Sequence, residues 1–260
     1  MADRIWSLEE GEGPLVGAAI HDGHAVREEV SRLLALDEES RLREEDPHTS
    51  AWTRVAPTRI VGLRSRFEVD LNRPRERAVY VHPEDAWGLR VWKETPPPEL
   101  VARSIEEYDG FYEAMHSLFR RLQEIHGRFV VLDLHSYNHR RAGPGAPPAD
   151  EEENPQVNIG TGPLDRSFWS PVVERLIADL RSYPFPGGPL DVRENVKFRG
   201  GRFSKWTCET FPRAACTVSI EWKKFFMDEW TGEPDSGMVE AIGAALESVV
   251  PGIVEELGRL

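Results

Sequence analysis

Short apolar runs alternate with helical patterns along this chain. The clearest run covers residues 129–134 and is rich in Val and Leu, which is typical of a strand buried on both faces of a sheet. A shorter run at residues 15–20 is bounded by glycine and predicts the first strand. Further extended segments are predicted at residues 59–71, 191–196 and 216–221.

Between these strands, apolar residues recur near the period of 3.6. The clearest case is residues 104–126, where Ser104 is a candidate N-cap and Glu107 would complete a capping box. Further helices are predicted at residues 26–36, 168–180 and 238–257, the last one interrupted at Pro251-Gly252. Because strands and helices alternate throughout, the sequence predicts a single α/β domain over residues 1–260, with a mixed, mostly parallel sheet flanked by helices.

Residues 142–155 interrupt this alternation with proline, glycine and acidic residues. Such a composition predicts a mobile surface loop within the domain. Because the loop follows the strand at residues 129–134 closely, it is a candidate lid over a ligand bound there. An insertion that is merely tolerated at the surface is the alternative.

The charge of the chain limits its partners. It has 260 residues, 30% of them charged, and a formal net charge of −13. An acidic surface argues against nonspecific binding to nucleic acid or to an anionic membrane, because both require a basic patch. No stretch is expected to reach the length of a membrane span, and the N-terminus lacks the apolar core of a signal peptide. Cys208 and Cys216 fit neither a disulfide framework nor a metal-binding pair, so we expect a cytoplasmic protein.

Polar residues end three of the apolar runs, at His21, His135 and Glu221. Ligands of such sheets bind beyond the carboxyl ends of the strands, so these side chains are expected to converge at one edge. Two histidines and a carboxylate are the usual composition of a catalytic zinc site, and a further carboxylate can serve as general base. Asp133 points to the same face of its strand as His135 and could orient that imidazole. Each histidine taken alone is equally well explained as a structural residue.

Basic residues gather near the extended segment. Pro74 fixes the backbone after Arg73, and a guanidinium can form a two-pronged bond to a carboxylate. Arg66 and Arg73 are therefore candidates for recognising an acidic substrate, and ordinary salt bridges are the alternative. Residues 195–202 add a basic turn with two glycines, which would let the backbone approach a ligand closely or would form an ordinary hairpin.

Taken in order, these clusters resemble the N-formylglutamate amidohydrolase (N-formylglutamate deformylase) family, which has a zinc-carboxypeptidase-like fold. The resemblance spans roughly residues 15–233 and rests on the order of short motifs. These are His21, Glu44-Glu45-Asp46, Asp70-Leu71-Asn72-Arg73-Pro74, Asp133-Leu134-His135-Ser136, Phe198-Arg199-Gly200-Gly201 and Ile220-Glu221. It implies a metal-dependent hydrolase that acts on an amide bond other than a peptide bond.

The resemblance implies one zinc ion bound by His21, an acidic residue and His135. Metallocarboxypeptidases take the acidic ligand from an HxxE motif, but the third residue after His21 is here His24. In the family, the acidic segment after the first helix is the expected source. Asp46 matches it best, and Glu45 and His24 are its rivals.

The resemblance also assigns Glu221 as the general base. The residues that it implies for binding substrate carboxylates are Arg66, Asn72, Arg73 and Arg199. The expected reaction is hydrolysis of an acidic N-acyl amino acid such as N-formyl-glutamate, which gives formate and glutamate. The insertion at residues 139–141 lies outside the family pattern. A metallocarboxypeptidase acting on peptide C-termini and a non-catalytic binding module of the same fold are the alternatives.

Overall fold

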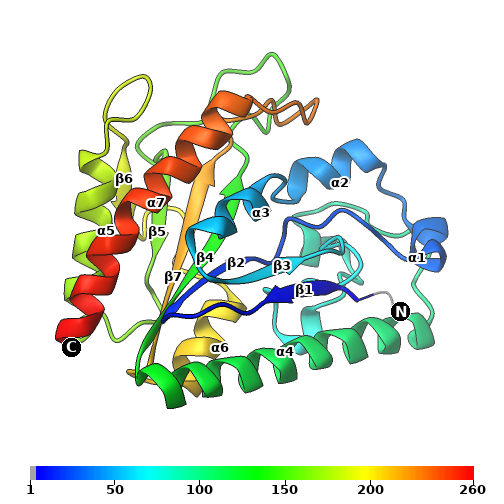
Figure 1. Cartoon of the computed structure of the whole chain (residues 1–260). Helices are drawn as coiled ribbons and strands as arrows, with labels where there is room; N and C mark the ends of the chain where they lie inside the picture. Colours follow the sequence, from blue (N-terminus) through cyan, green and yellow to red (C-terminus); the bar gives the residue numbers. More distant parts are fainter. Residues whose placement is uncertain (1–3) are drawn as a thin grey trace.

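The computed structural model describes residues 4–260, which form a seven-stranded sheet flanked by helices (Figure 1). The strand order is β1-β3-β2-β4-β7-β5-β6. In chain order the strands are β1 (Trp6–Glu9), β2 (Leu15–Ala19), β3 (Thr58–Gly62), β4 (Phe129–Tyr137), β5 (Val157–Gly160), β6 (Val192–Glu194) and β7 (Ala215–Lys223). The pairs β1–β3 and β5–β7 are antiparallel and the others are parallel, so the predicted mixed, mostly parallel sheet is confirmed.

Helices cover both faces of this sheet. The α-helices are α1 (Glu28–Leu33), α2 (Glu38–Glu44), α3 (Thr49–Trp52), α4 (Pro98–His126), α5 (Ser170–Ser182), α6 (Arg202–Thr210) and α7 (Ser236–Arg259), and the 3-10 helices are η1 (Thr53–Val55), η2 (Arg75–Arg77) and η3 (Pro83–Ala86). Helices α5 and α7 pack on one face, and α4 and α6 pack on the other (Figure 1).

The central strand β4 shows how the sequence pattern builds the two faces. All of its residues are buried. Leu132 and Leu134 pack in the core with α5 and α7, whereas Phe129 and Val131 pack in the core with α4 and α6. His135 continues the second set, because side chains alternate along a strand. One face of β4 therefore stays apolar while the other turns polar near the end of the strand.

Helices α4 and α7 differ from the sequence prediction in ways that their prolines explain. Helix α4 begins at Pro98. Proline is favoured in the first turn of a helix, because the N–H group that it lacks would have no partner within the helix. Ser104 is consequently buried within the helix, where its hydroxyl accepts a hydrogen bond from Arg27, and it is not a cap. Helix α7 continues through Pro251, and Gly252 allows it to approach the side chains of α5 closely.

The predicted extended segment at residues 59–71 is only half correct. Strand β3 accounts for its first part, but residues 66–72 contain two turns. The alternating apolar residues there enter two different cores, because Phe67 packs near α1 while Val69 and Leu71 pack under α4. The short elements β1, β5, α2 and α6 were not predicted.

Helix α7 is long and apolar enough to cross a membrane by length and composition, so the prediction that no stretch reaches that length was wrong. Its inner face, which includes Ile242, Leu246 and Val249, is buried in the core shared with α5. A core helix of a folded domain can meet the same criterion as a membrane span.

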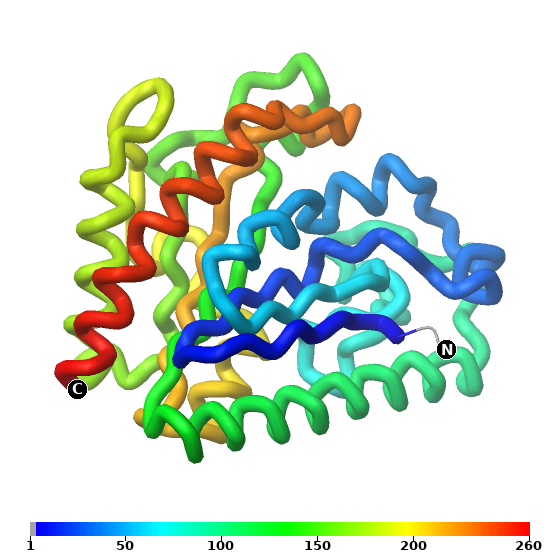
Figure 2. Tube along the Cα trace, viewed as in Figure 1, coloured from blue at the N-terminus to red at the C-terminus, as the bar shows by residue number. Residues whose placement is uncertain are grey.

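Residues 138–156 contain no helix or strand, and the segment at 142–155 for which a mobile loop is predicted lies within them. The start of this segment is tied to the chain after β7. The carboxylate of Glu229 accepts hydrogen bonds from the backbone N–H groups of His139 and Arg140, at 2.8 and 2.7 Å. The indole of Trp230 donates to the carbonyl of Arg140 at 3.0 Å. Figure 2 shows the two segments side by side at the top of the molecule.

Candidate active site

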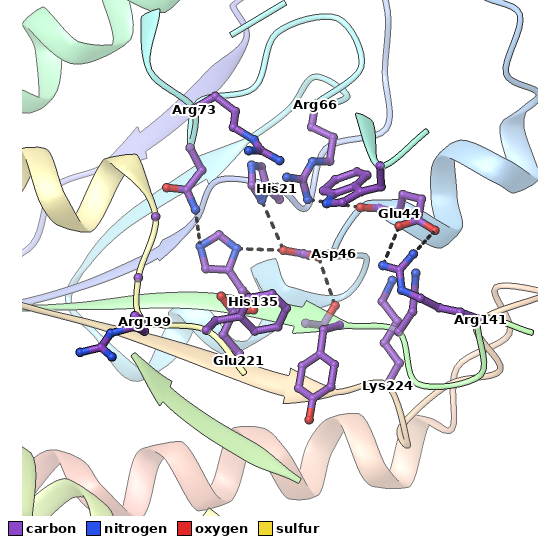
Figure 3. A pocket seen from close by; sticks show the side chains of 18 residues that line it. His21, Glu44, Asp46, Arg66, Arg73, His135, Arg141, Arg199, Glu221 and Lys224 are labelled. Atoms are coloured by element: carbon purple, nitrogen blue, oxygen red, sulfur yellow. Dashed lines mark hydrogen bonds and ion pairs between the residues drawn. The ribbon is translucent and has the colours of Figure 1, made fainter. Parts of the chain in front are cut away.

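Three side chains from separate segments meet at the carboxyl ends of the central strands (Figure 3). His21 follows β2, Asp46 follows α2, and His135 lies near the end of β4. One ligand atom from each lies within 4.8 Å of the others. Oδ2 of Asp46 is 2.9 Å from Nδ1 of His135 and 3.5 Å from Nδ1 of His21. All three side chains are buried.

Each histidine has a second carboxylate behind it. Nε2 of His21 lies 2.7 Å from Oδ1 of Asp70, and Nε2 of His135 lies 3.0 Å from Oδ1 of Asp133. Such a carboxylate fixes the orientation of an imidazole and leaves its other nitrogen free to bind a metal. In both residues that nitrogen is Nδ1, which faces Asp46. The alternation in β4 predicted the role of Asp133, whereas the sequence assigned no role to Asp70.

Asp70 is buried and bonds both to His21 in the cluster and to the neighbouring Arg66. Oδ1 also accepts a hydrogen bond from the backbone N–H of Asn72 at 2.7 Å. Oδ2 accepts hydrogen bonds from Nη2 of Arg66, at 2.8 Å, and from the hydroxyl of Tyr80. Burial would raise the pKa of Asp70, but the charges of Arg66 and His21 hold that pKa well below its usual range. Asp70 is therefore ionised.

The charges within the cluster determine its protonation. Burial would raise the pKa of Asp46, but hydrogen bonds with His135 and His21 hold it far below its usual range. Burial would lower the pKa of His135, but Asp133 and Glu221 hold it well above its usual range. Without a metal, both ring nitrogens of His135 therefore carry a proton. A cation bound at Nδ1 would displace the proton from that nitrogen.

Glu221 lies opposite His135 in the parallel pairing of β4 with β7 and lines the same cavity. Its carboxylate makes no hydrogen bond within the described part of the chain. Burial raises the pKa of Glu221 to about 8, with Asp46 and Asp133 adding to the shift and His135 opposing it. A carboxyl group that titrates near neutral pH is suited to general acid–base chemistry.

Glu45 and His24, the rivals of Asp46, lie in a different network. Glu45 accepts a hydrogen bond from the hydroxyl of Ser65, and its other oxygen lies 2.5 Å from Nδ1 of His24. Arg41 donates to the carbonyl of His24 at 2.9 Å. This network packs beside the cluster and fixes the chain that leads into Asp46. Of the three candidates, Asp46 alone enters the cluster.

The cluster opens into a cavity of about 360 Å³. Among the described residues, three carboxylates line it, those of Glu44, Asp46 and Glu221. The cationic side chains that line it are Arg66, Arg73, Arg141, Arg199 and Lys224. In a chain with a net charge of −13, this local excess of positive charge favours an anionic ligand.

Arg66 and Arg73 lie on one side of the cluster (Figure 3), and Trp87 lines the cavity in contact with both. Arg66 donates hydrogen bonds to Asp70 and, at 3.3 Å, to the carbonyl of Glu44, so much of its capacity is used. The ion pair of Arg73 with Asp70 is longer, with 3.9 Å between its Nε and Oδ2 of Asp70. Both guanidinium groups stack on Trp87, at 4.9 and 5.6 Å from the ring centroid. No sequence pattern singled out Trp87.

Asn72 and Arg199 also line the cavity. Oδ1 of Asn72 accepts a hydrogen bond from the backbone N–H of Phe203 at 2.9 Å, and Nδ2 lies 3.4 Å from Nε2 of His135. Gly201 permits this approach, because a Cβ there would come within 2.3 Å of the Asn72 amide. Arg199 is exposed, and Figure 3 shows its guanidinium directed away from the cluster. Asn72 thus reaches the histidine, whereas Arg199 stays at the rim.

The sequence also assigned no role to three charged residues that line the cavity, Glu44, Arg141 and Lys224. Arg141, from the insertion after β4, donates from two nitrogens to the two carboxylate oxygens of Glu44, at 3.2 and 3.0 Å. Lys224 is buried, and burial lowers its pKa to about 8. Its ammonium donates to the carbonyls of Arg43 and Glu45. The insertion therefore contributes directly to the wall of the cavity.

The donor set fits a zinc ion. Nδ1 of His21, Nδ1 of His135 and Oδ2 of Asp46 face one another, and each imidazole is oriented from behind by a carboxylate. Two histidines and one carboxylate are a composition found in catalytic zinc sites, in which the fourth position is left for water or substrate. The three residues are therefore a possible metal site.

The fold is a mixed α/β sheet with a buried cluster of histidines and carboxylates at the carboxyl ends of its central strands. A family model described as N-formylglutamate amidohydrolase matches residues 13–224, which is most of the chain. The chain therefore belongs to the N-formylglutamate amidohydrolase family, and it is a hydrolase that acts on an amide bond. The family predicted from the order of the motifs is confirmed.

Two solved structures share the fold. The crystal structure of N-formylglutamate amidohydrolase from Ralstonia eutropha JMP134 is 18% identical, with a TM-score of 0.73 and 98% of each chain covered. Gene product Atu2144 from Agrobacterium tumefaciens is also 18% identical, with a TM-score of 0.62, and the match covers 95% of this chain and 96% of the other. A comparison with curated protein sequences finds no match.

Proposed function

We propose that this protein removes the acyl group from an acidic N-acyl amino acid, with N-formyl-glutamate as the expected substrate and one zinc ion as cofactor. The observation that carries the proposal is the convergence of His21, Asp46 and His135 within 4.8 Å, beside Glu221, in a cavity lined by several cationic side chains. Membership of the family supports hydrolysis of an amide bond. The zinc ion and the acidic substrate are inferred from the site.

In this proposal His21, Asp46 and His135 hold the metal. A bound zinc ion supplies Lewis acidity toward the acyl carbonyl and lowers the pKa of a water molecule to about 7. Asp70 and Asp133 keep the two imidazoles in place through Nε2. Because these contacts exist before substrate binds, the protein does not have to order the site during the reaction.

Glu221 is the proposed general base. It accepts a proton from the attacking water and passes it to the nitrogen of the breaking amide bond, so formate and a free amine are released. Burial raises the pKa of Glu221 to about 8 in the protein alone. A cation close by favours the ionised form of a carboxyl group, which is the form that a base requires.

Arg73 is the side chain best placed to bind a substrate carboxylate. Its contact with Asp70 is long, at 3.9 Å, and stacking on Trp87 orients its guanidinium. A free guanidinium of this kind can form a two-pronged bond to a carboxylate. Arg199 is exposed at the rim, and its side chain would turn from the orientation in Figure 3 toward the cavity to take the second carboxylate of a glutamate derivative. Arg66 supports the wall through its bond to Asp70.

Metal analysis and a substrate panel test the proposal. The purified protein should contain one zinc ion per chain, and it should hydrolyse N-formyl-glutamate faster than N-acetyl-glutamate, neutral N-formyl amino acids or peptides. Faster cleavage of peptides would identify a metallocarboxypeptidase instead. A protein that binds no divalent metal and hydrolyses none of these compounds would be a binding module.

A pair of variants tests the recognition of the carboxylate. Arg73→Ala should lower kcat/KM for N-formyl-glutamate by roughly 10- to 100-fold, the value of a lost hydrogen bond to a charged group. The α-methyl ester should be a poor substrate of the wild type, and the variant should discriminate less between acid and ester. Arg75→Ala is the matched control, because Arg75 is exposed and paired with Asp109. Equal turnover of acid and ester by the wild type would refute the role of Arg73.

A further inference from the structure

We propose that Lys224 is a positioning residue that holds the acidic ligand in place, an inference that rests on the proposed metal site. Lys224 lies just beyond β7, three residues after Glu221, and its side chain is almost completely buried. Nζ donates hydrogen bonds to the backbone carbonyls of Arg43, at 2.6 Å, and Glu45, at 2.7 Å. Both carbonyls belong to the segment that leads directly into Asp46.

This segment requires an anchor from outside. Helix α2 is short, and its own backbone satisfies the carbonyl of Arg41 but not those at its C-terminal end. Lys224 binds the carbonyls of Arg43 and Glu45, and Arg66 donates to that of Glu44 at 3.3 Å. A cation at the C-terminal end satisfies such carbonyls and interacts favourably with the helix dipole. The backbone N–H of Asp46 donates to the carbonyl of His21 at 3.0 Å. Lys224 and Arg66 thus bind the carbonyls that precede Asp46, and the carbonyl of His21 binds the backbone N–H of Asp46, so the backbone that carries this carboxylate is held on both sides.

The same lysine links the ligand to the proposed base. The backbone N–H of Lys224 donates to the carbonyl of Tyr137 at the end of β4, at 3.0 Å. Glu221 and Lys224 therefore share one strand end, and that strand is paired with the strand of His135. A single rigid element consequently sets the spacing between Glu221 and Asp46. Removal of the ammonium would leave two buried carbonyls unpaired and release the segment before Asp46.

Zinc affinity and cobalt spectroscopy separate this role from a purely structural one. Lys224→Met preserves most of the side-chain volume but removes the donors, and it should weaken zinc binding by about 10- to 100-fold, as is usual for residues that position metal ligands. The visible absorption of the cobalt-substituted variant should also change, because it depends on ligand geometry. Lys223→Met is the matched control, since the ammonium of Lys223 makes no hydrogen bond within the described residues, and it should bind zinc as the wild type does.

Lys224→Gln retains an amide donor and should bind zinc with an affinity between those of the wild type and Lys224→Met. If Lys224→Met does not fold, the Gln variant carries the same test. A variant that melts earlier but keeps the zinc affinity and cobalt spectrum of the wild type would show that Lys224 is only structural, which refutes the inference alone. A wild type that binds no metal would overturn the proposed function together with it.

Discussion

Replacement of Asp70 by asparagine should damage both the metal site and the fold, whereas Asp133→Asn should damage chiefly the metal site. Both carboxylates orient a histidine through Nε2, at 2.7 Å from His21 and 3.0 Å from His135. Loss of such a contact typically weakens metal binding by about 10- to 100-fold. We therefore expect a similar loss of zinc affinity in the two variants.

The two variants should differ in stability because their partners differ. Asp70 also neutralises Arg66, whose guanidinium cannot lose its proton, and a buried charge left without its partner costs about 3–5 kcal/mol. Asp133 binds the hydroxyl of Ser219 and His135, and an imidazole can become neutral. Asp133→Asn should then lower the free energy of unfolding by about 1–3 kcal/mol, which is the cost of leaving buried hydrogen-bonding groups unpaired.

Denaturant unfolding of the chelator-treated proteins measures the free energies, and chelator competition measures the zinc affinities. The pKa of Asp70 is held below its usual range, so its contribution is present above the unfolded-state pKa and is lost as the pH falls. The gap in stability between wild type and Asp70→Asn should therefore narrow below about pH 4. Equal destabilisation by the two variants, or normal zinc affinity in Asp70→Asn, would refute this reasoning.

The remaining predictions concern the ligands, the base and the bound proton. In chelator competition, Asp46→Ala should lose most of the zinc affinity and Glu45→Ala much less, and the reverse order would move the ligand to position 45. Glu221→Gln should keep zinc but lose about 10²- to 10⁴-fold in kcat, and near-normal turnover would reassign the base. Because neighbouring carboxylates outweigh burial and raise the pKa of His135, zinc affinity should rise about tenfold per pH unit across neutral pH; a flat profile would contradict this.

The two histidines could be predicted because each follows an apolar run that forms a central strand. The alternation in β4 placed Asp133 and His135 on one face, and the parallel arrangement brought His21 to the same edge of the sheet. Glu221 followed from the same pattern in β7. These positions depend on local periodicity and on the direction of the strands, which are properties that a single sequence expresses.

The acidic ligand could not be predicted from periodicity. Glu44, Glu45 and Asp46 are consecutive, and only contacts with distant segments decide where each side chain points. Glu45 bonds to Ser65, and Glu44 pairs with Arg141. Of the three, Asp46 is the one that reaches His21 and His135. The resemblance to a family selected Asp46, and the side-chain geometry agrees with that selection.

Elements with weak local signals were missed for a related reason. Helix α6 has no side-chain cap from its own N-cap residue Gly201, and the amide oxygen of Asn72 accepts a hydrogen bond from its first turn instead. Strand β5 has four residues and follows the acidic loop, so its pattern is too short to be distinguished. Asn72 stabilises the start of α6, and pairing with β7 stabilises β5. Both partners lie far away in the sequence, so the local pattern does not reveal either element.

The charges around the site explain why a cation suits it. Arg66 balances Asp70 permanently, because a guanidinium remains charged. Burial leads Glu221 to keep its proton, with a pKa raised to about 8, whereas hydrogen bonds with His135 and His21 keep Asp46 ionised. A divalent cation would stabilise both carboxylates and take the place of the proton on Nδ1 of His135. Metal binding and proton release are then one event, which is why the pH dependence of zinc affinity tests the electrostatics of the whole cluster.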